Sequence, residues 1–219
     1  AREIPAEALY GVQTLRGIEN FSISKFRLSE YPLFIKGLAI TKMAAAMANF
    51  ELGLLTVEQK DAIIAACGEI IDGKHHDQFP VDMIQGGAGT TTNMNANEVI
   101  ANRALELMGH ERGEYQYCSP NDHVNCSQST NDAYPTAIHI GMYFKHLQLL
   151  PHLEELIASF RKKGEEFSRI IKMGRTQLED AVPMTLGQTF NGFASILQDE
   201  IAHLNEAAAD FLVVNMGAT

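Results

Sequence analysis

Apolar side chains recur every three or four residues over most of the chain, which is the period of a helix with one buried face. Pro32 suits the first position of such a helix, and Gly53 fits its end. Thr56 and Gln59 form the capping-box pattern at the start of the next helix. The predicted helices of the first half cover residues 33–51, 57–72 and 91–108.

The first 30 residues and one later stretch lack this period. Tyr10–Thr14 and Ile18–Ile23 are short enough, and apolar enough, to be predicted as a pair of strands. The stretch from His110 to Asp132 is polar and aperiodic, which predicts a long loop, and long ordered loops are often functional. The predicted fold class is therefore all-α, mostly helical, with minor short strands in a small N-terminal domain.

The second half carries two long apolar stripes, from Ile140 to Phe160 and from Leu186 to Phe211. Pro151 is expected to kink or divide the first of these two helices. Seven of the eight positions in the last stripe are large, and burying them is worth about 14 kcal/mol at roughly 2 kcal/mol each. That is about the whole net stability of a domain. We therefore expect further helices, from a missing C-terminal segment or from partner subunits, and expect the chain to be a fragment.

The composition and net charge of the chain make several classes of function unexpected. With 46% apolar residues and a net charge of −10, the chain is expected to have a core and to bind no nucleic acid. No apolar run reaches the length that predicts a membrane span, and no charged-then-apolar leader opens the chain, so no membrane contact is expected. Three scattered cysteines are expected to be reduced thiols in a cytoplasmic protein.

Two polar clusters could carry chemistry or merely begin helices. Gly86–Asn93 is a glycine-rich loop before a helix, which suits an anion, but it lacks a P-loop lysine and can also be a simple cap. Asn121–Asn125 and Gln128–Asp132 offer many short neutral donors, and Ser129 to Asp132 could instead cap the following helix. A hydrolase using Asp122, His123 and Ser129 lacks a nucleophile elbow. The pair His75-His76 lacks companion metal ligands.

A third cluster, Gly174–Pro183, is predicted as a polar turn between the two long helices. Arg175 is expected to form a salt bridge there with Glu179 or Asp180. Together the three clusters offer hydroxyls, amides and helix-start N–H groups with little cationic chemistry. Such a set suits a small carboxylate substrate in a dry site, but it does not identify a reaction.

At these residues the sequence resembles the aspartase/fumarase superfamily, and its aspartase branch most closely. The resemblance runs from Tyr10-Gly11 and Arg16 to Gly217-Ala218-Thr219. The matching motifs are Gly86–Thr90, Asn93–Val99, Asn121–Asn125, Gln128–Thr136, Gly174–Leu178 and Pro183–Gln188.

The resemblance implies an N-terminal domain over residues 1–130 and the first part of a central helical bundle over 131–219. It also implies a homotetramer whose active sites lie where three subunits meet. The family's catalytic loop, Gly-Ser-Ser-x-Met-Pro-x-Lys-x-Asn, carries the serine base and does not occur in these 219 residues. The chain is therefore expected to be the N-terminal half of the enzyme and inactive by itself.

The activity implied is reversible elimination of ammonia from L-aspartate to give fumarate through an aci-carboxylate dianion. By their places in the motifs, Thr90, Ser129 and Thr130 would bind the β-carboxylate. Asn131 and Gln177 would lie near the amino group, with Thr90 assisting, and Thr176 would hold the α-carboxylate. No cofactor and no metal ligand are expected.

Two alternatives remain. Fumarases, which add water to fumarate, typically have serine where this chain has Thr130 and histidine where it has Gln177, although some aspartases also carry the histidine. The other alternative is a non-catalytic helical assembly module, because these residues lack the serine base.

Overall fold

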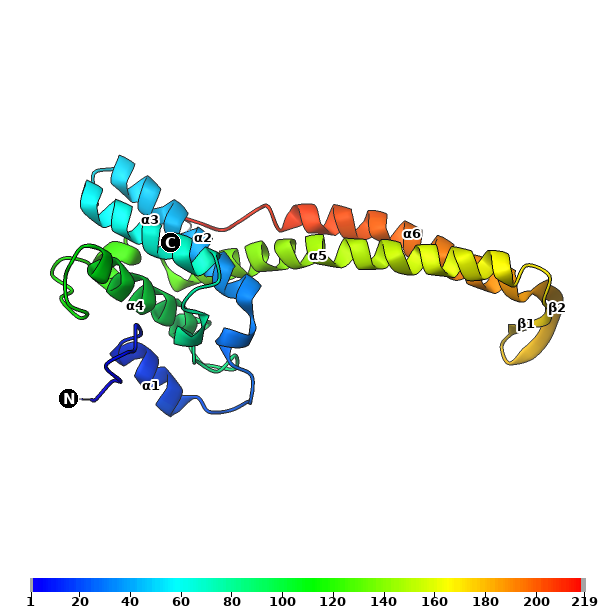
Figure 1. Ribbon diagram of the computed structural model, residues 1–219, viewed down its shortest axis with the longest axis horizontal. Coiled ribbons are helices and arrows are strands. Elements are labelled where there is room, and N and C mark those ends of the chain that lie inside the picture. The colour runs from blue at the N-terminus through cyan, green and yellow to red at the C-terminus, as the bar shows by residue number, and fades with distance from the viewer. Residues whose placement is uncertain (1, 218–219) are drawn as a thin grey trace. The chain divides into compact units, whose positions relative to one another are not determined.

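The computed structural model describes residues 2–217 and is mostly helical, as predicted (Figure 1). Its α-helices are α1 (Val12–Asn20), α2 (Pro32–Glu51), α3 (Val57–Ile71), α4 (Thr90–Leu107), α5 (Thr130–Glu166) and α6 (Leu186–Asp210). Shorter helical turns are η1 (Leu28–Glu30), η2 (His76–Gln78) and the π-helix η3 (Pro120–Val124). Two strands, β1 (Ile171–Thr176) and β2 (Glu179–Thr185), pair as an antiparallel hairpin. Ala218 and Thr219, where the family resemblance ends, lie outside the described residues.

The described residues form two compact units. The first holds the residues up to Met142 together with those from Val213 onward, and the second holds Tyr143–Leu212. The predicted boundary between residues 130 and 131 coincides with the start of α5, and it stays a prediction.

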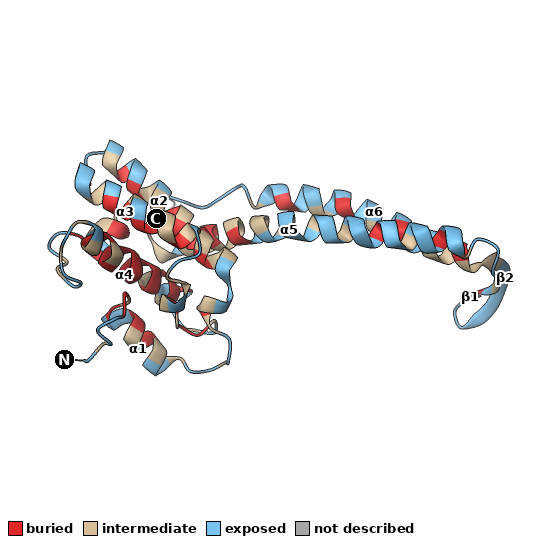
Figure 2. Ribbon diagram, viewed as in Figure 1, coloured by how far each residue is buried: buried red, intermediate tan, exposed pale blue. Residues whose placement is uncertain are grey.

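The core of the first unit is built around α4, which is buried along almost its whole length (Figure 2). Helix α3 packs against both α2 and α4, and α1 packs against α4. Local signals set the ends of these helices as expected. Thr56 and Gln59 form both bonds of the capping box of α3, and Gly53 has the positive φ of 74° that suits the turn after α2.

The prediction of strands near the N-terminus is wrong, because residues 12–20 form α1. The Glu98 carboxylate, from α4, accepts the backbone N–H groups of Gly11, Gln13 and Thr14 at 2.9, 2.9 and 3.0 Å. It also accepts the Thr14 hydroxyl at 2.7 Å. A buried carboxylate thus satisfies the free donors at the start of α1 and complements its dipole. Since the partner is 84 to 87 residues away, the local pattern could not reveal it.

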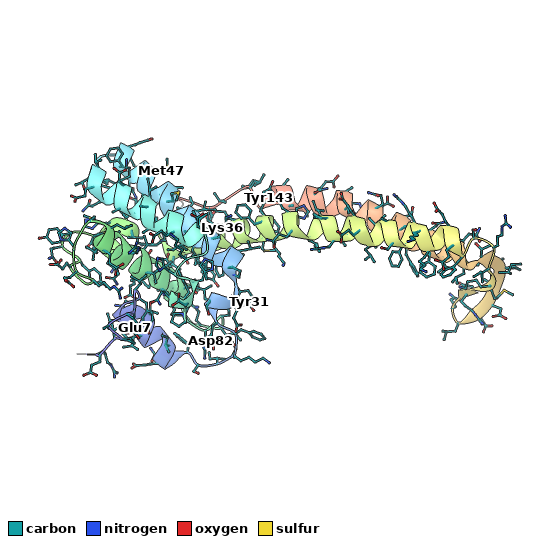
Figure 3. All side chains as sticks on the ribbon, in the orientation of Figure 1. Glu7, Tyr31, Lys36, Met47, Asp82 and Tyr143 are labelled. Atoms are coloured by element: carbon teal, nitrogen blue, oxygen red, sulfur yellow. The ribbon has the colours of Figure 1, made fainter. Side chains whose placement is uncertain are left out.

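A second buried carboxylate, that of Asp82, holds the segment between α1 and η1 (Figure 3). It accepts the backbone N–H groups of Ile23 and Ser24 at 3.0 and 2.7 Å and pairs with the Arg27 guanidinium at 3.0 Å. These bonds, with an isolated antiparallel bridge between Arg27 and Asp82, join the segment to the loop before α4 and satisfy its backbone donors without a continuous strand.

A further correction concerns α2, which is long and apolar enough, with a mean hydropathy of 1.3, to cross a membrane by length and composition. Its apolar side chains Ile35, Leu38, Ala39 and Ala46 instead lie in the core of the first unit. Burial in a folded domain therefore accounts for its apolar character.

In the second unit, the later part of α5 pairs with α6. Ile157, Ala194 and Ile201 form the buried seam, and rings of Phe160, Phe167, Phe190 and Phe193 contact one another. The stripe on α6 is only partly covered, since Phe193 is 47% exposed. A Cβ on Gly187 would lie 2.4 Å from the Gly164 carbonyl oxygen, so glycine allows the two helices to meet closely there.

Helix α5 is not divided at Pro151 but continues for 37 residues, so of the two outcomes expected there only a kink stays a prediction. Leu150 and Leu153, on either side of the proline, pack against the seam with α6. The Gly174–Pro183 turn is the greater part of the β1–β2 hairpin. Its expected salt bridge is confirmed, because Arg175 pairs with Asp180 across the hairpin.

Candidate functional site

The glycine-rich loop forms a tight left-handed turn at the start of α4. Gly87, Ala88 and Gly89 have φ values of 72°, 50° and 90°, which glycine adopts readily and alanine does not. A Cβ at Gly89 would lie 2.4 Å from the ring of Tyr134, so only glycine permits this contact with α5. Thr90, the first residue of α4, is exposed, and its hydroxyl donates to the Gly87 carbonyl oxygen at 2.6 Å.

The start of α5 is capped by one of the predicted site residues. The Oγ atom of Ser129 accepts the backbone N–H of Asn131 at 3.2 Å, and the Asp132 carboxylate accepts the N–H of Ser129 at 3.3 Å. The two bonds are reciprocal as in a capping box, except that the Ser129 oxygen accepts from the second rather than the third residue after it. Ser129 therefore does cap the helix, which was the simpler interpretation of this cluster, and the bond uses a lone pair of its oxygen rather than its proton.

The starts of α4 and α5 lie against each other. Asn93, one turn into α4, donates through Nδ2 to Oγ1 of Thr130 at 3.1 Å. Beside this contact is a pocket of about 370 Å³, lined by Gln85, Ala88, Gly89, Asn131, Tyr134 and Pro135. The structure thus brings Thr90, Ser129, Thr130 and Asn131 to adjoining helix starts, where two positive dipole ends favour an anion.

A buried lysine lies behind this pair of helix starts. Lys42 on α2 is fully buried, and its Nζ donates to Oδ1 of Asn125 at 2.8 Å and to Oε1 of Gln128 at 3.0 Å. Burial lowers the pKa of Lys42 to about 7, because two neutral amide oxygens replace only part of its hydration. Asn125 also accepts from Asn93 at 3.1 Å, so the lysine is joined to Thr130 by two intervening amides.

The two remaining predicted site residues belong to the second unit, at the tip of the hairpin. Thr176 ends β1 and pairs with Glu179, which leaves Gln177 and Leu178 as the two-residue turn. Both have left-handed φ values, 48° and 66°, without a glycine between them. Non-glycine residues in this region carry about 1–2 kcal/mol of strain each, and such strain is often retained where a functional side chain needs it. Leu178 is 97% exposed.

The other residues considered as catalytic or metal-binding candidates form ordinary structural hydrogen bonds and ion pairs. The hydroxyl of Ser119 donates to Asp122 at 2.9 Å and its backbone N–H donates to His123 at 2.7 Å, so both side chains bond Ser119 rather than Ser129. His75 pairs with Glu69, and His76 bonds the Ile70 carbonyl. Within residues 2–217, no group of three or more His, Cys, Asp or Glu side chains could hold a metal ion.

Comparison with known proteins gives the family. A family model described as lyase matches residues 1–219. The chain belongs to this lyase family. It is 58% identical to an aspartate ammonia-lyase of Pseudomonas canavaninivorans over 99% of the chain, and 55% identical to that of Escherichia coli K12 over all of it. In each case it covers 46% of the relative, so the chain spans about half the length of these lyases.

Solved structures of related lyases have the same fold. A fumarate lyase from Brucella melitensis, described as bound to cobalt, superposes with a TM-score of 0.96 at 54% identity, over 100% of this chain and 47% of that one. A class II fumarase from Schistosoma mansoni superposes with a TM-score of 0.88 at 38% identity, over 99% and 45%.

The sequence interpretation missed several residues that shape the pocket and its support. Tyr134 and Gln85 line the pocket, and Asn93 and Lys42 lie behind it. Two features of the sequence could have indicated Asn93 and Lys42. Asn93, Asn95 and Asn97 alternate within a predicted helix, where asparagine is unfavourable unless it has a partner. Lys42 is the only charged residue between Gly37 and Phe50, in a largely apolar run, which indicates a buried group with a specific role.

Proposed function

We propose that this chain is the N-terminal half of an aspartate ammonia-lyase and supplies substrate-binding donors to its active site. The proposal is supported mainly by the pocket at the starts of α4 and α5, in a chain 55–58% identical to aspartate ammonia-lyases. The complete enzyme is a cytoplasmic homotetramer in this proposal, with sites shared among subunits. It uses no cofactor.

In the proposed reaction, a base from outside these 219 residues removes a proton from the carbon next to the β-carboxylate of L-aspartate. The electron pair moves into the carboxylate and forms a dianion, which then collapses to the double bond of fumarate as ammonia leaves. Stabilising that dianion is the main task of the protein, since placed donors are worth most where charge develops. Thr90, Ser129 and Thr130 take this role.

The hydrogen bonds at the helix starts support these roles. Ser129 and Thr130 each accept a hydrogen bond, from Asn131 N–H and from Asn93 Nδ2, so each keeps its own proton for a substrate oxygen. Asn131 lines the pocket and is assigned to the amino group. The positive dipole ends of the two helices add to the stabilisation of the dianion.

Thr176 and Gln177 complete the proposed set from the hairpin. Thr176 holds the α-carboxylate, and Gln177 lies near the departing amino group. In a tetramer with shared sites, the hairpin and the pocket of one site can come from different subunits. The strained turn at Gln177 and Leu178 supports a functional role for the hairpin tip.

Fumarase is the second candidate, because the Schistosoma mansoni class II fumarase has the same fold. Gln177 favours the deaminase. Ammonia departs readily from an ammonium group, whereas hydroxide needs a proton from a strong acid, which an amide cannot supply.

The test compares L-aspartate with L-malate in the full-length protein. We expect fumarate to form readily from L-aspartate and barely from L-malate. Gln177→His should retain aspartate activity and add a titration at about pH 6.5 to the rate profile, because histidine titrates there and glutamine does not. A full-length protein with a higher kcat/KM for L-malate would replace the aspartase proposal with fumarase. One that converts neither would favour the assembly module.

A further inference from the structure

The polarity of the hydrogen bonds behind Thr130 follows from the orientation of Asn125. Its Nδ2 donates to the Gln128 backbone carbonyl at 2.9 Å, and a carbonyl oxygen can only accept. The other end of the amide, Oδ1, therefore faces Lys42 at 2.8 Å, and the lysine nitrogen can donate to it as an ammonium or as a neutral amine. The Gln128 carbonyl thus fixes the orientation of Asn125.

Asn125 in turn fixes Asn93. Because Oδ1 of Asn125 faces Asn93 at 3.1 Å, the facing atom of Asn93 must be its amide nitrogen. That nitrogen has two protons, and the second is directed to Oγ1 of Thr130 at 3.1 Å. The reverse orientation would place two carbonyl oxygens against each other. Oδ1 of Asn93 is buried without a partner among the described residues, which is the cost of this arrangement.

Asn93 then sets the direction of the Thr130 hydroxyl. A threonine hydroxyl has one proton, and since its oxygen accepts from Asn93, the proton must point elsewhere. Within the described residues the Thr130 hydroxyl makes no hydrogen bond as a donor. The proton is left to donate to a ligand at the helix starts.

We propose that Asn93 is a positioning residue that holds the Thr130 hydroxyl as a hydrogen-bond donor toward the β-carboxylate of the substrate, with a polarity set by the Gln128 backbone carbonyl through Asn125. This inference rests on the proposed ammonia-lyase function. Asn93 is 2% exposed, so it is not placed to contact a substrate and acts through Thr130. Its benefit is preorganisation, because the hydroxyl needs no reorientation when negative charge develops.

The test is a double-mutant cycle in the full-length protein. Asn93→Leu keeps the size of the side chain but removes the donor, so the hydroxyl can rotate. It should lower kcat/KM for L-aspartate about tenfold, mainly through kcat, because the lost interaction strengthens in the transition state. Thr130→Val should lower it about 100-fold. The Thr130→Val variant has no hydroxyl to orient, so adding Asn93→Leu to it should cost less than about threefold more.

Two further variants separate positioning from general damage to the fold. Asn95→Leu is the matched control, since Asn95 is equally buried on the same helix and donates to the Gln78 carbonyl instead. It should leave kcat nearly unchanged. Thr130→Ser keeps a hydroxyl, so the effect of Asn93→Leu should persist in that background. If Asn93→Leu does not fold, Asn93→Ala removes the same donor with less crowding and replaces it in the cycle.

The outcomes distinguish this inference from the function on which it rests. A full-length protein that does not deaminate L-aspartate overturns both. Suppose instead that it deaminates L-aspartate, but Asn93→Leu lowers kcat/KM by the same factor in the Thr130→Val background as in the unsubstituted enzyme. Asn93 then does not act through the hydroxyl, and only the positioning role fails. An unchanged rate for Thr130→Val alone also overturns it.

Discussion

The Glu98 carboxylate offers the sharpest test of how the first unit is held together. It accepts four hydrogen bonds, three of them at Oε2 and the fourth, from the Gln13 N–H, at Oε1. Glu98→Gln can keep a carbonyl oxygen at the place of Oε2, but its NH₂ group would then take the place of Oε1 and face the Gln13 N–H. One bond is lost outright and the other three lose their charge assistance.

The expected loss in the free energy of unfolding is about 3–5 kcal/mol, since a hydrogen bond to a charged group is worth about 1.5–3 kcal/mol. Thr14→Val removes only the hydroxyl bond and should cost about 1–2 kcal/mol. Glu98→Gln is the more costly variant because it removes one bond and weakens three, whereas Thr14→Val removes only one.

Urea unfolding followed by tyrosine fluorescence measures this loss, because five of the six tyrosines lie in the first unit and the chain has no tryptophan. Glu51→Gln, at an exposed position on α2, is the matched control and should change stability by less than about 0.5 kcal/mol. Hydrogen exchange at the Gly11, Gln13 and Thr14 amides reports the cap directly and should accelerate in Glu98→Gln. A stability within about 1 kcal/mol of the control variant, with those amides still protected, would refute the reasoning.

Two further predictions concern the hairpin and the buried lysine. Leu178→Gly should raise the stability of the second unit by about 1 kcal/mol, because glycine adopts the left-handed conformation without strain. Thermal unfolding followed by circular dichroism measures it, and Val182→Gly, in the extended strand β2, should instead destabilise. Burial lowers the pKa of Lys42 from 10.5 to about 7, so the unfolded chain binds more protons between these values and stability should rise with pH across that window. Lys42→Met should abolish this part of the dependence and the exposed control Lys74→Met should not. Identical urea midpoints at about pH 7 and about pH 9 in the unsubstituted chain would contradict the assignment.

Features decided by neighbouring residues were predictable from the sequence. The capping box at Thr56, the start of α2 at Pro32 and the apolar stripe along α6 all involve residues within one or two turns of each other. The same holds for the salt bridge of Arg175, which spans a two-residue turn. The helical fold class follows from these local patterns, which the packing of the helices then reinforces.

The errors arose where the deciding contact is distant in the sequence. Helix α1 depends on Glu98, and α5 remains continuous past Pro151 because side chains on α6 pack on both sides of it. The hairpin was missed for another reason. Its turn, Gln177-Leu178, lacks the Asn-Gly type of sequence that normally marks a left-handed two-residue turn. Because Gln177 and Leu178 do not prefer the left-handed conformation that they adopt, the sequence gives no indication of this turn.

Helix capping and ligand binding compete as explanations for the Ser129 cluster when only the sequence is considered, but the hydrogen bonds make them compatible. A cap uses an oxygen lone pair, and a carboxylate ligand needs a proton. Ser129 and Thr130 both accept within the fold and keep their protons, whereas the Thr90 proton is already bonded to the Gly87 carbonyl at 2.6 Å. Thr90 must therefore give up that bond before it can donate to a substrate. The two helix starts thus differ: α5 presents donors that are ready, and α4 presents one that must be released from the glycine-rich loop.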